Sequence, residues 1–180
     1  MNLLITKLRK NNSKLVYFIF FFYFLIGILT FTNYGISIDE KFQRLSGFYW
    51  LKYLLSFTNF DYLKEVTNLK FFSIVDYTLP AIQYSVKYSI FFDIPAALIE
   101  IIFKIEDSKK YFEIRHFFNF FIFFLSSVYF YKLLKNRFSN YNVSILGLIF
   151  YIFSPKIYGA SFYNNKDIIF LSLLVISIYY

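Results

Sequence analysis

The stretch "LVYFIFFFYFLIGILTFT", residues 15–32, decides the fold class of this chain. It contains 18 residues and no charged side chain. As a helix it is about 27 Å long at roughly 1.5 Å per residue, close to the hydrocarbon thickness of a bilayer. Lys7, Arg9, Lys10 and Lys14 precede it, and no small-x-small cleavage site follows it. We therefore expect a retained membrane-spanning helix here rather than a signal peptide.

The composition of the whole chain agrees with a membrane protein. Of its 180 residues, 58% are hydrophobic and 26% are aromatic, which is more apolar and far more aromatic than a soluble domain. The chain has no Cys, which excludes disulfide bonds and Cys-based metal sites. The net charge of +8 is distributed as membrane topology requires, so we expect membrane lipids and no nucleic acid as partners.

Further apolar runs predict an all-α polytopic membrane protein. The last run is still apolar at Tyr180, so we expect an N-terminal fragment of a longer enzyme and expect activity from the longer protein. The expected plan has a basic cytoplasmic N-terminus (1–14), a first span (15–32), an outer loop with amphipathic helices (33–116), a second span (117–134), a cytoplasmic turn (135–142), a third span (143–158), an outer loop (159–167) and a truncated fourth span (168–180).

The charges orient these spans. Lys132, Lys135 and Arg137 form a second basic cluster, which the positive-inside rule places on the cytoplasmic side together with the N-terminus. The outer loop then holds 10 of the 11 acidic residues, and Asp167 lies on the same outer face. Every carboxylate of the chain is thus expected outside, as in a protein whose site lies at the outer surface, which we take to be that of a bacterial inner membrane.

The outer loop is rich enough in apolar residues to form helices. Its first part, residues 39–57, predicts an amphipathic helix in the membrane interface, with Arg44 on the polar side. The expected apolar stripe consists of Phe42, Leu45, Tyr49, Trp50, Tyr53 and Phe57. A second helix is expected over 94–104, with Asp93 as its N-cap. The stretch 79–105 is read as re-entrant or interfacial; if it spans instead, the orientation beyond it inverts.

Two adjacent carboxylates, Asp39 and Glu40, follow the first span in the sequence "SIDE". Ser37 and Glu40 fit a capping box, in which both residues satisfy the first turn of a helix. Neighbouring helical side chains diverge by about 100°, so Glu40 can cap while Asp39 projects. An ionised carboxylate in that position can accept a proton.

Four motifs taken in order resemble the glycosyltransferases of the GT-C fold, in the branch of protein O-mannosyltransferases and undecaprenyl-phosphate-sugar transferases. They are "SIDE" (37–40), "FFDIPAALIE" (91–100), "EIRHFFNFFIFF" (113–124) and "FSPKIYGASFYNNKDIIF" (153–170), where Asn165 replaces the usual proline. The resemblance implies a GT-C fold and a sugar donor linked to polyprenyl phosphate. It also implies a hydroxyl acceptor on a protein, lipid or glycan.

The resemblance also implies roles for particular residues. Asp39 would be the catalytic base, and Glu40, Arg115, His116, Lys166 and Asp167 would bind the substrate. A divalent metal bridging Asp39 and Asp167 is left open. Structural alternatives remain for several of them: Asp39 and Glu40 as cap and dipole partners at the start of a helix, Arg115 as a snorkelling anchor, His116 as an interfacial polar residue, and Asp167 as a partner of the helix dipole.

Two functions of other classes also stay open at this point. A transporter or flippase subunit should carry charges within its spans, whereas the first and third expected spans have none and the second has only Lys132 at its end. A non-catalytic membrane scaffold would need no particular carboxylate, so the importance of Asp39 separates it from an enzyme.

Overall fold

The computed structural model describes residues 2–74 and 90–180, with side chains for 14–73 and 90–180. Every element in this part of the chain is helical, which confirms the expected all-α class. The elements are α1 (Asn2–Thr30), a 3₁₀ turn η1 (Phe31–Asn33), α2 (Ile38–Ser56), α3 (Asp61–Ile74), α4 (Ile90–Ile102), α5 (Ser108–Arg137), α6 (Tyr141–Phe153), α7 (Pro155–Tyr163) and α8 (Asp167–Tyr179).

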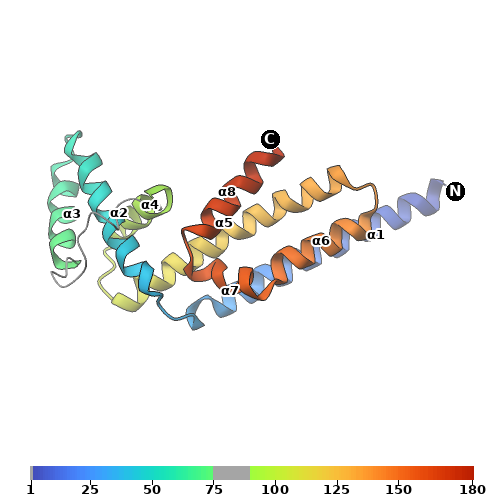
Figure 1. Ribbon diagram of the computed structural model, residues 1–180, viewed down its shortest axis with the longest axis horizontal. Helices are drawn as coiled ribbons and strands as arrows, with labels where there is room; N and C mark the ends of the chain where they lie inside the picture. Colours follow the sequence, from blue (N-terminus) through green and yellow to red (C-terminus); the bar gives the residue numbers. More distant parts are fainter. Residues whose placement is uncertain (1, 75–89) are drawn as a thin grey trace.

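The helices form an elongated bundle and a separate group at one end of it (Figure 1). The bundle consists of α1, α5, α6, α7 and α8, and we call α2, α3 and α4 the head. The N-terminus and the α5–α6 connection lie at the end opposite the head (Figure 1). Both basic clusters of the sequence therefore belong to the same end of the bundle.

Two described helices are long and apolar enough to cross a membrane. One covers Lys14–Asn33 and the other is α5, Ser108–Arg137. Helices α6 and α7 form a third candidate only if they are counted together as one span with a bend of 53°. Helix α8 is apolar but shorter. These helices support a membrane protein.

Several helices begin or end away from the expected boundaries. α1 starts at Asn2, so the basic N-terminus is helical as well. α5 starts at Ser108 because Asp107 caps it, its side chain accepting a hydrogen bond from the backbone N of Lys109 at 2.9 Å. Arg115 and His116 consequently lie inside a long helix rather than in the loop before it.

The expected third span is broken at Ser154. α6 ends at Phe153, and α7 begins at Pro155 with an axis bent by 53°. Proline lacks a backbone N–H and keeps the preceding residue out of the α region, so a helix rarely passes through this point. The outer loop expected over 159–167 is correspondingly shorter, because α7 continues to Tyr163 and α8 begins at Asp167.

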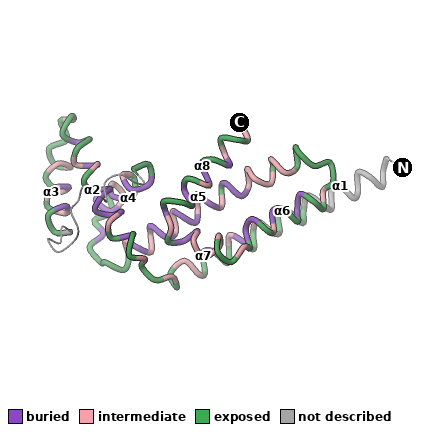
Figure 2. The backbone as a smooth tube through the Cα atoms, viewed as in Figure 1, coloured by how far each residue is buried: buried purple, intermediate pink, exposed green. Residues whose placement is uncertain are grey.

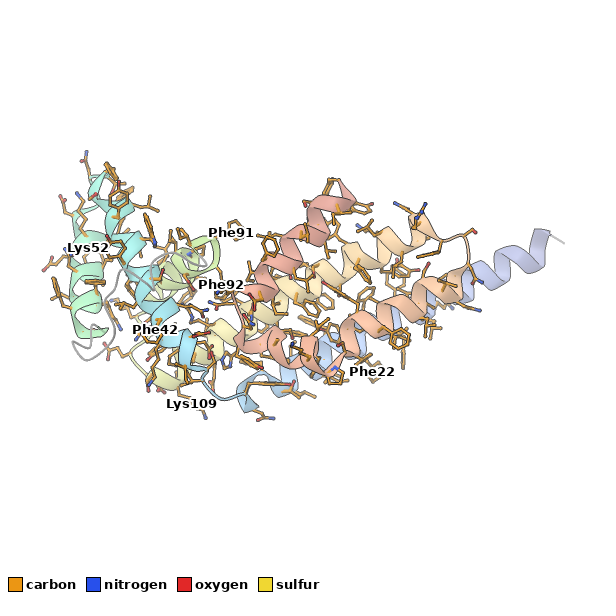
Figure 3. The ribbon with its side chains drawn as sticks, viewed as in Figure 1. Phe22, Phe42, Lys52, Phe91, Phe92 and Lys109 are labelled. Carbon is orange, nitrogen blue, oxygen red and sulfur yellow. The ribbon has the colours of Figure 1, made fainter. Side chains whose placement is uncertain are left out.

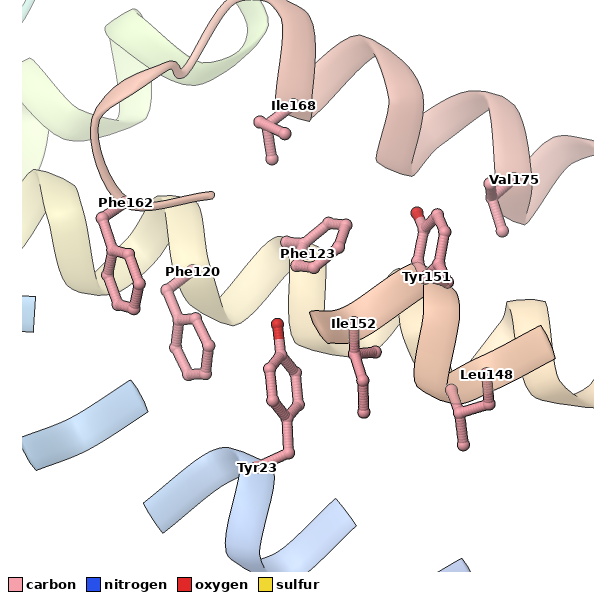
Figure 4. Packing of buried hydrophobic residues seen from close by; sticks show 9 residues of the cluster. All are labelled: Tyr23, Phe120, Phe123, Leu148, Tyr151, Ile152, Phe162, Ile168 and Val175. Atoms are coloured by element: carbon pink, nitrogen blue, oxygen red, sulfur yellow. The ribbon is translucent and has the colours of Figure 1, made fainter. Parts of the chain in front are cut away.

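The bundle is held together by aromatic and aliphatic side chains from all of its helices (Figure 4). The rings of Phe120 and Phe162 stack with centroids 5.1 Å apart, and Tyr23 reaches Phe120 at 5.4 Å. Other large side chains point outward, among them Phe22 (Figure 3). Such an outer surface is suited to lipid.

The head has its own core between α2, α3 and α4, in which Phe48 and Ala97 are fully buried. Figure 2 shows buried stretches along these helices. The helix expected over 39–57 is present as α2, but its buried face is not the expected one. Arg44, assigned to the polar side, is buried, whereas Tyr53 and Phe57 of the expected apolar stripe are 50% and 73% exposed. The packing of α4 against α2 decides which face is covered, and the sequence of α2 alone does not contain that information.

The helix expected over 94–104 begins earlier, at Ile90. Asp93 is therefore inside the first turn rather than an N-cap, and it is fully buried. Of the stretch 79–105, residues 75–89 lie outside the described part of the chain. The described part, α4, has 13 residues, which at about 1.5 Å each is too short to cross a bilayer.

Close contact between α2 and α4 depends on Gly47. A Cβ atom there would lie 2.4 Å from the carbonyl O of Asp93. We expect Gly47→Ala to lower the free energy of unfolding by about 1–3 kcal/mol, because backbone atoms cannot move away as a flexible side chain can. Gly159→Ala is the control: a Cβ there meets nothing within 4 Å, and alanine should stabilise α7 by about 0.5–1 kcal/mol. Equal melting temperatures for the two variants would contradict this packing.

Candidate functional site

The two carboxylates of "SIDE" occupy different environments at the start of α2. Asp39 is exposed, and among the described residues it has no hydrogen-bond or ion-pair partner. Glu40 is 2% exposed, and its Oε2 accepts a hydrogen bond from the backbone N of Ser37 at 2.6 Å. The capping arrangement expected from the sequence is thus present, and it leaves Asp39 free to project.

Glu40 has a second role that the sequence did not reveal. Its Oε1 lies 2.8 Å from Nε2 of His116 on α5. A carboxylate accepts, so the proton of this bond belongs to Nε2. His116 is 1% exposed, which makes it a buried contact between the head and the bundle rather than an interfacial polar residue.

Beside His116, Arg115 forms a buried ion pair with Asp93 of α4. Nη2 of Arg115 donates to Oδ1 of Asp93 at 2.5 Å, and Nδ2 of Asn165 donates to the same oxygen at 2.9 Å. Arg115 is 3% exposed, so it is not a snorkelling anchor. Burial raises the pKa of Asp93 to about 7, against the lowering effects of Arg115 and Asn165.

These contacts leave several buried polar atoms without a partner among the described residues. They are Nε and Nη1 of Arg115, Nδ1 of His116, Oδ2 of Asp93, Oδ1 of Asn165, and both amide atoms of Asn119. Buried polar atoms are normally bonded to protein or to water. The junction between head and bundle therefore offers both donors and acceptors to further polar groups, with the guanidinium as the strongest donor.

A third ionic contact lies within the head, between α2 and α4. Nε of Arg44 donates to Oε2 of Glu100 at 3.0 Å, and Nη2 donates to Oε1. The guanidinium also stacks on Tyr111 at the start of α5, 3.6 Å from the ring centroid. Arg44 therefore holds α2, α4 and α5 together, which explains why it is buried in spite of its charge.

The two remaining predicted site residues lie at the start of α8. Lys166 and Asp167 are exposed, and Asp167 exchanges two hydrogen bonds of 3.0 Å with Asn164, one through its carboxylate and one through its backbone N. No group of three or more His, Cys, Asp or Glu that could hold a metal occurs within residues 2–74 and 90–180. The metal suggested between Asp39 and Asp167 stays a prediction.

The structure thus brings Glu40, Arg115 and His116 to one junction and adds Asp93 and Asn165 to them. The sequence predicts an N-cap at Asp93 because this residue precedes an apolar helix with Pro95. Asn165 stands out in the sequence only as a substitution for proline in the family motif. The sequence offers a signal for Asp93, since a carboxylate within an apolar stretch needs a partner when it is buried. Asn165 lies in the polar run "NNKD", which offers no such signal.

Comparison with models of protein families, with curated proteins and with solved structures finds no match to this chain.

Proposed function

We propose that this chain belongs to a membrane glycosyltransferase of GT-C type, which moves a sugar from a polyprenyl-phosphate carrier to a hydroxyl acceptor at the outer face of the membrane. The observation that carries the proposal is the division of the carboxylate pair directly after the first apolar helix. Glu40 is fixed by Ser37 and His116, while Asp39 is exposed and has no partner among the described residues.

The reaction needs one proton acceptor and one group that stabilises the leaving phosphate. The acceptor oxygen bonds to the anomeric carbon as the bond from that carbon to the phosphate oxygen breaks. The polyprenyl phosphate leaves with the electron pair, and Asp39 takes the proton of the acceptor hydroxyl. Asp39 suits this role because it is exposed in the first turn of α2, where the helix dipole favours a negative charge.

The junction residues supply what an anionic leaving group requires. Arg115 has two buried nitrogens, Nε and Nη1, without a partner among the described residues. Guanidinium N–H groups bind phosphate strongly. The donor lipid would remain in the bilayer beside α1 and α5 while its head group reaches this junction. The head lies opposite the basic end of the bundle (Figure 1), and this arrangement supports the proposal of a site at the outer face.

The proposal is tested by sugar transfer. Membranes containing the full-length protein are given a series of labelled polyprenyl-phosphate hexoses, and the release of polyprenyl phosphate is measured. We expect release with at least one donor, and none with a donor whose phosphate is esterified by a methyl group. Absence of both binding and release for the whole series would contradict a glycosyltransferase and favour a scaffold or a transporter.

Replacing Arg115 by Lys tests its contact with the phosphate. Lysine keeps a positive charge beside Asp93 but cannot reproduce the forked geometry of a guanidinium. We expect the dissociation constant of the donor to rise roughly tenfold, the effect of one lost charge-assisted hydrogen bond. Arg137→Lys, at the exposed opposite end of α5, is the control. Equal donor affinity for Arg115→Lys and the unaltered protein would remove Arg115 from the binding site.

A further inference from the structure

A groove lies between α1 and α5 at the end of the bundle away from the head. Its walls are formed by Val16, Tyr17 and Phe20 on α1 and by Phe124, Val128 and Tyr131 on α5, and Lys132 and Lys135 complete its lining. Its volume is about 370 Å³. None of these residues belongs to the junction around Arg115, so the groove is a separate feature of the molecule.

The groove has a charged end at Lys132 and Lys135. The ring of Phe20 contacts both Phe124 and Tyr131, with centroids 5.9 Å and 6.2 Å away, so α1 and α5 touch along the groove. Lys135 lies 11 positions after Phe124, which is about 16 Å of helix at roughly 1.5 Å per residue. Half of a hydrocarbon core of about 30 Å is close to this length. The groove therefore matches one leaflet of a bilayer.

The charged end carries positive charge without a counter-ion among the described residues. No Asp or Glu occurs between residues 114 and 166, and neither lysine has an ion pair within the described residues. Nζ of Lys132 lies 4.7 Å from the ring centroid of Tyr129 and 5.5 Å from that of Tyr179. Those contacts hold the side chain in place but do not neutralise its charge.

We propose that this groove binds an anionic phospholipid of the leaflet at the basic end of the bundle. One acyl chain lies between α1 and α5, and the head-group phosphate is bound by Lys132 and Lys135. An acyl chain of a zwitterionic lipid would fit between the same apolar walls, but the cationic group of its head would lie near the two lysines and be repelled by them. An apolar helix from another protein would bury two ammonium groups without a partner, which is costly. The two lysines therefore favour the anionic lipid.

The test compares two lipids on the full chain. The protein is placed in vesicles of equal parts phosphatidylglycerol and phosphatidylcholine, extracted in mild detergent, and examined by native mass spectrometry for bound lipid. We expect phosphatidylglycerol to be retained preferentially. Each lysine near the membrane surface raises the affinity for anionic lipid on the order of fivefold. The double variant Lys132→Gln, Lys135→Gln should therefore reduce the preference for phosphatidylglycerol by about tenfold or more.

Two further variants separate the groove from general surface charge. The double variant Lys109→Gln, Lys110→Gln removes two lysines from the opposite end of α5, and it should leave the preference unchanged. Val128→Trp fills the groove while keeping every charge, and it should abolish retention of the lipid. Retention of phosphatidylglycerol by Val128→Trp at the level of the unaltered protein would overturn the proposal, as would a dimer that excludes lipid from the unaltered chain. Circular dichroism confirms that each variant stays helical.

Discussion

Asp39→Asn is expected to reduce the turnover of sugar transfer by roughly 10²-fold or more, the lower end of the effects of general bases. Asparagine keeps the size and shape of aspartate and removes only the ability to accept the proton. Because Asp39 is exposed and has no partner among the described residues, the change should leave the melting temperature almost unaltered. The measurement is release of polyprenyl phosphate by the full-length protein, with a thermal melt alongside.

The neighbouring Glu40 provides the matched control. Gln can still accept from the backbone N of Ser37 and can still bond to His116, so Glu40→Gln should retain most of the activity. Glu40→Ala leaves His116 buried without its partner and should lower the free energy of unfolding by about 1–3 kcal/mol. An active Asp39→Asn variant beside an inactive but folded Glu40→Gln variant would mean that Glu40 is the base. Normal activity in both would assign the pair to structure.

The helices were largely predictable from the sequence because their signals are local. An uncharged run of 18 residues and a Ser-x-x-Glu sequence predict where α1 and α2 lie. Local patterns could not predict which face of α2 is buried, because the packing of α4 against α2 determines that face. Periodicity also missed the bend at Ser154, although Pro155 was available as the signal for it.

The candidate site was predictable only in part, for a related reason. The resemblance points to Glu40, Arg115 and His116. The contacts at the junction join residues that are far apart in the sequence: Glu40 and His116 are separated by 76 positions, and Asp93 and Asn165 by 72. No periodicity or capping rule pairs residues at such distances. A local rule made Asp93 an N-cap, and the fold made it the partner of Arg115.

Removal of the Asp93 carboxylate should have the largest effect on stability. Asp93→Ala leaves the Arg115 guanidinium buried without its counter-ion, and breaking a buried pair from one side typically costs about 3–5 kcal/mol. Asn165 loses its acceptor at the same time. Because these residues join α4, α5 and the segment before α8, we expect the head to separate from the bundle first. The measurement is a thermal melt in detergent, together with hydrogen exchange in α4 and α5.

The double variant Asp93→Ala, Arg115→Met shows whether the loss comes from the unpaired charge. Methionine fills much of the space of the arginine stem without a charge, so the double variant should be more stable than Asp93→Ala alone. Asp61→Ala is the exposed control, because the Asp61 side chain is 92% exposed and its one ion pair among the described residues is with Lys64 at 3.5 Å; such pairs contribute about 0–1 kcal/mol. If Asp93→Ala and Asp61→Ala have the same melting temperature, the Asp93–Arg115 pair does not hold the head on the bundle. Arg115 could then bind the phosphate without being paired to Asp93.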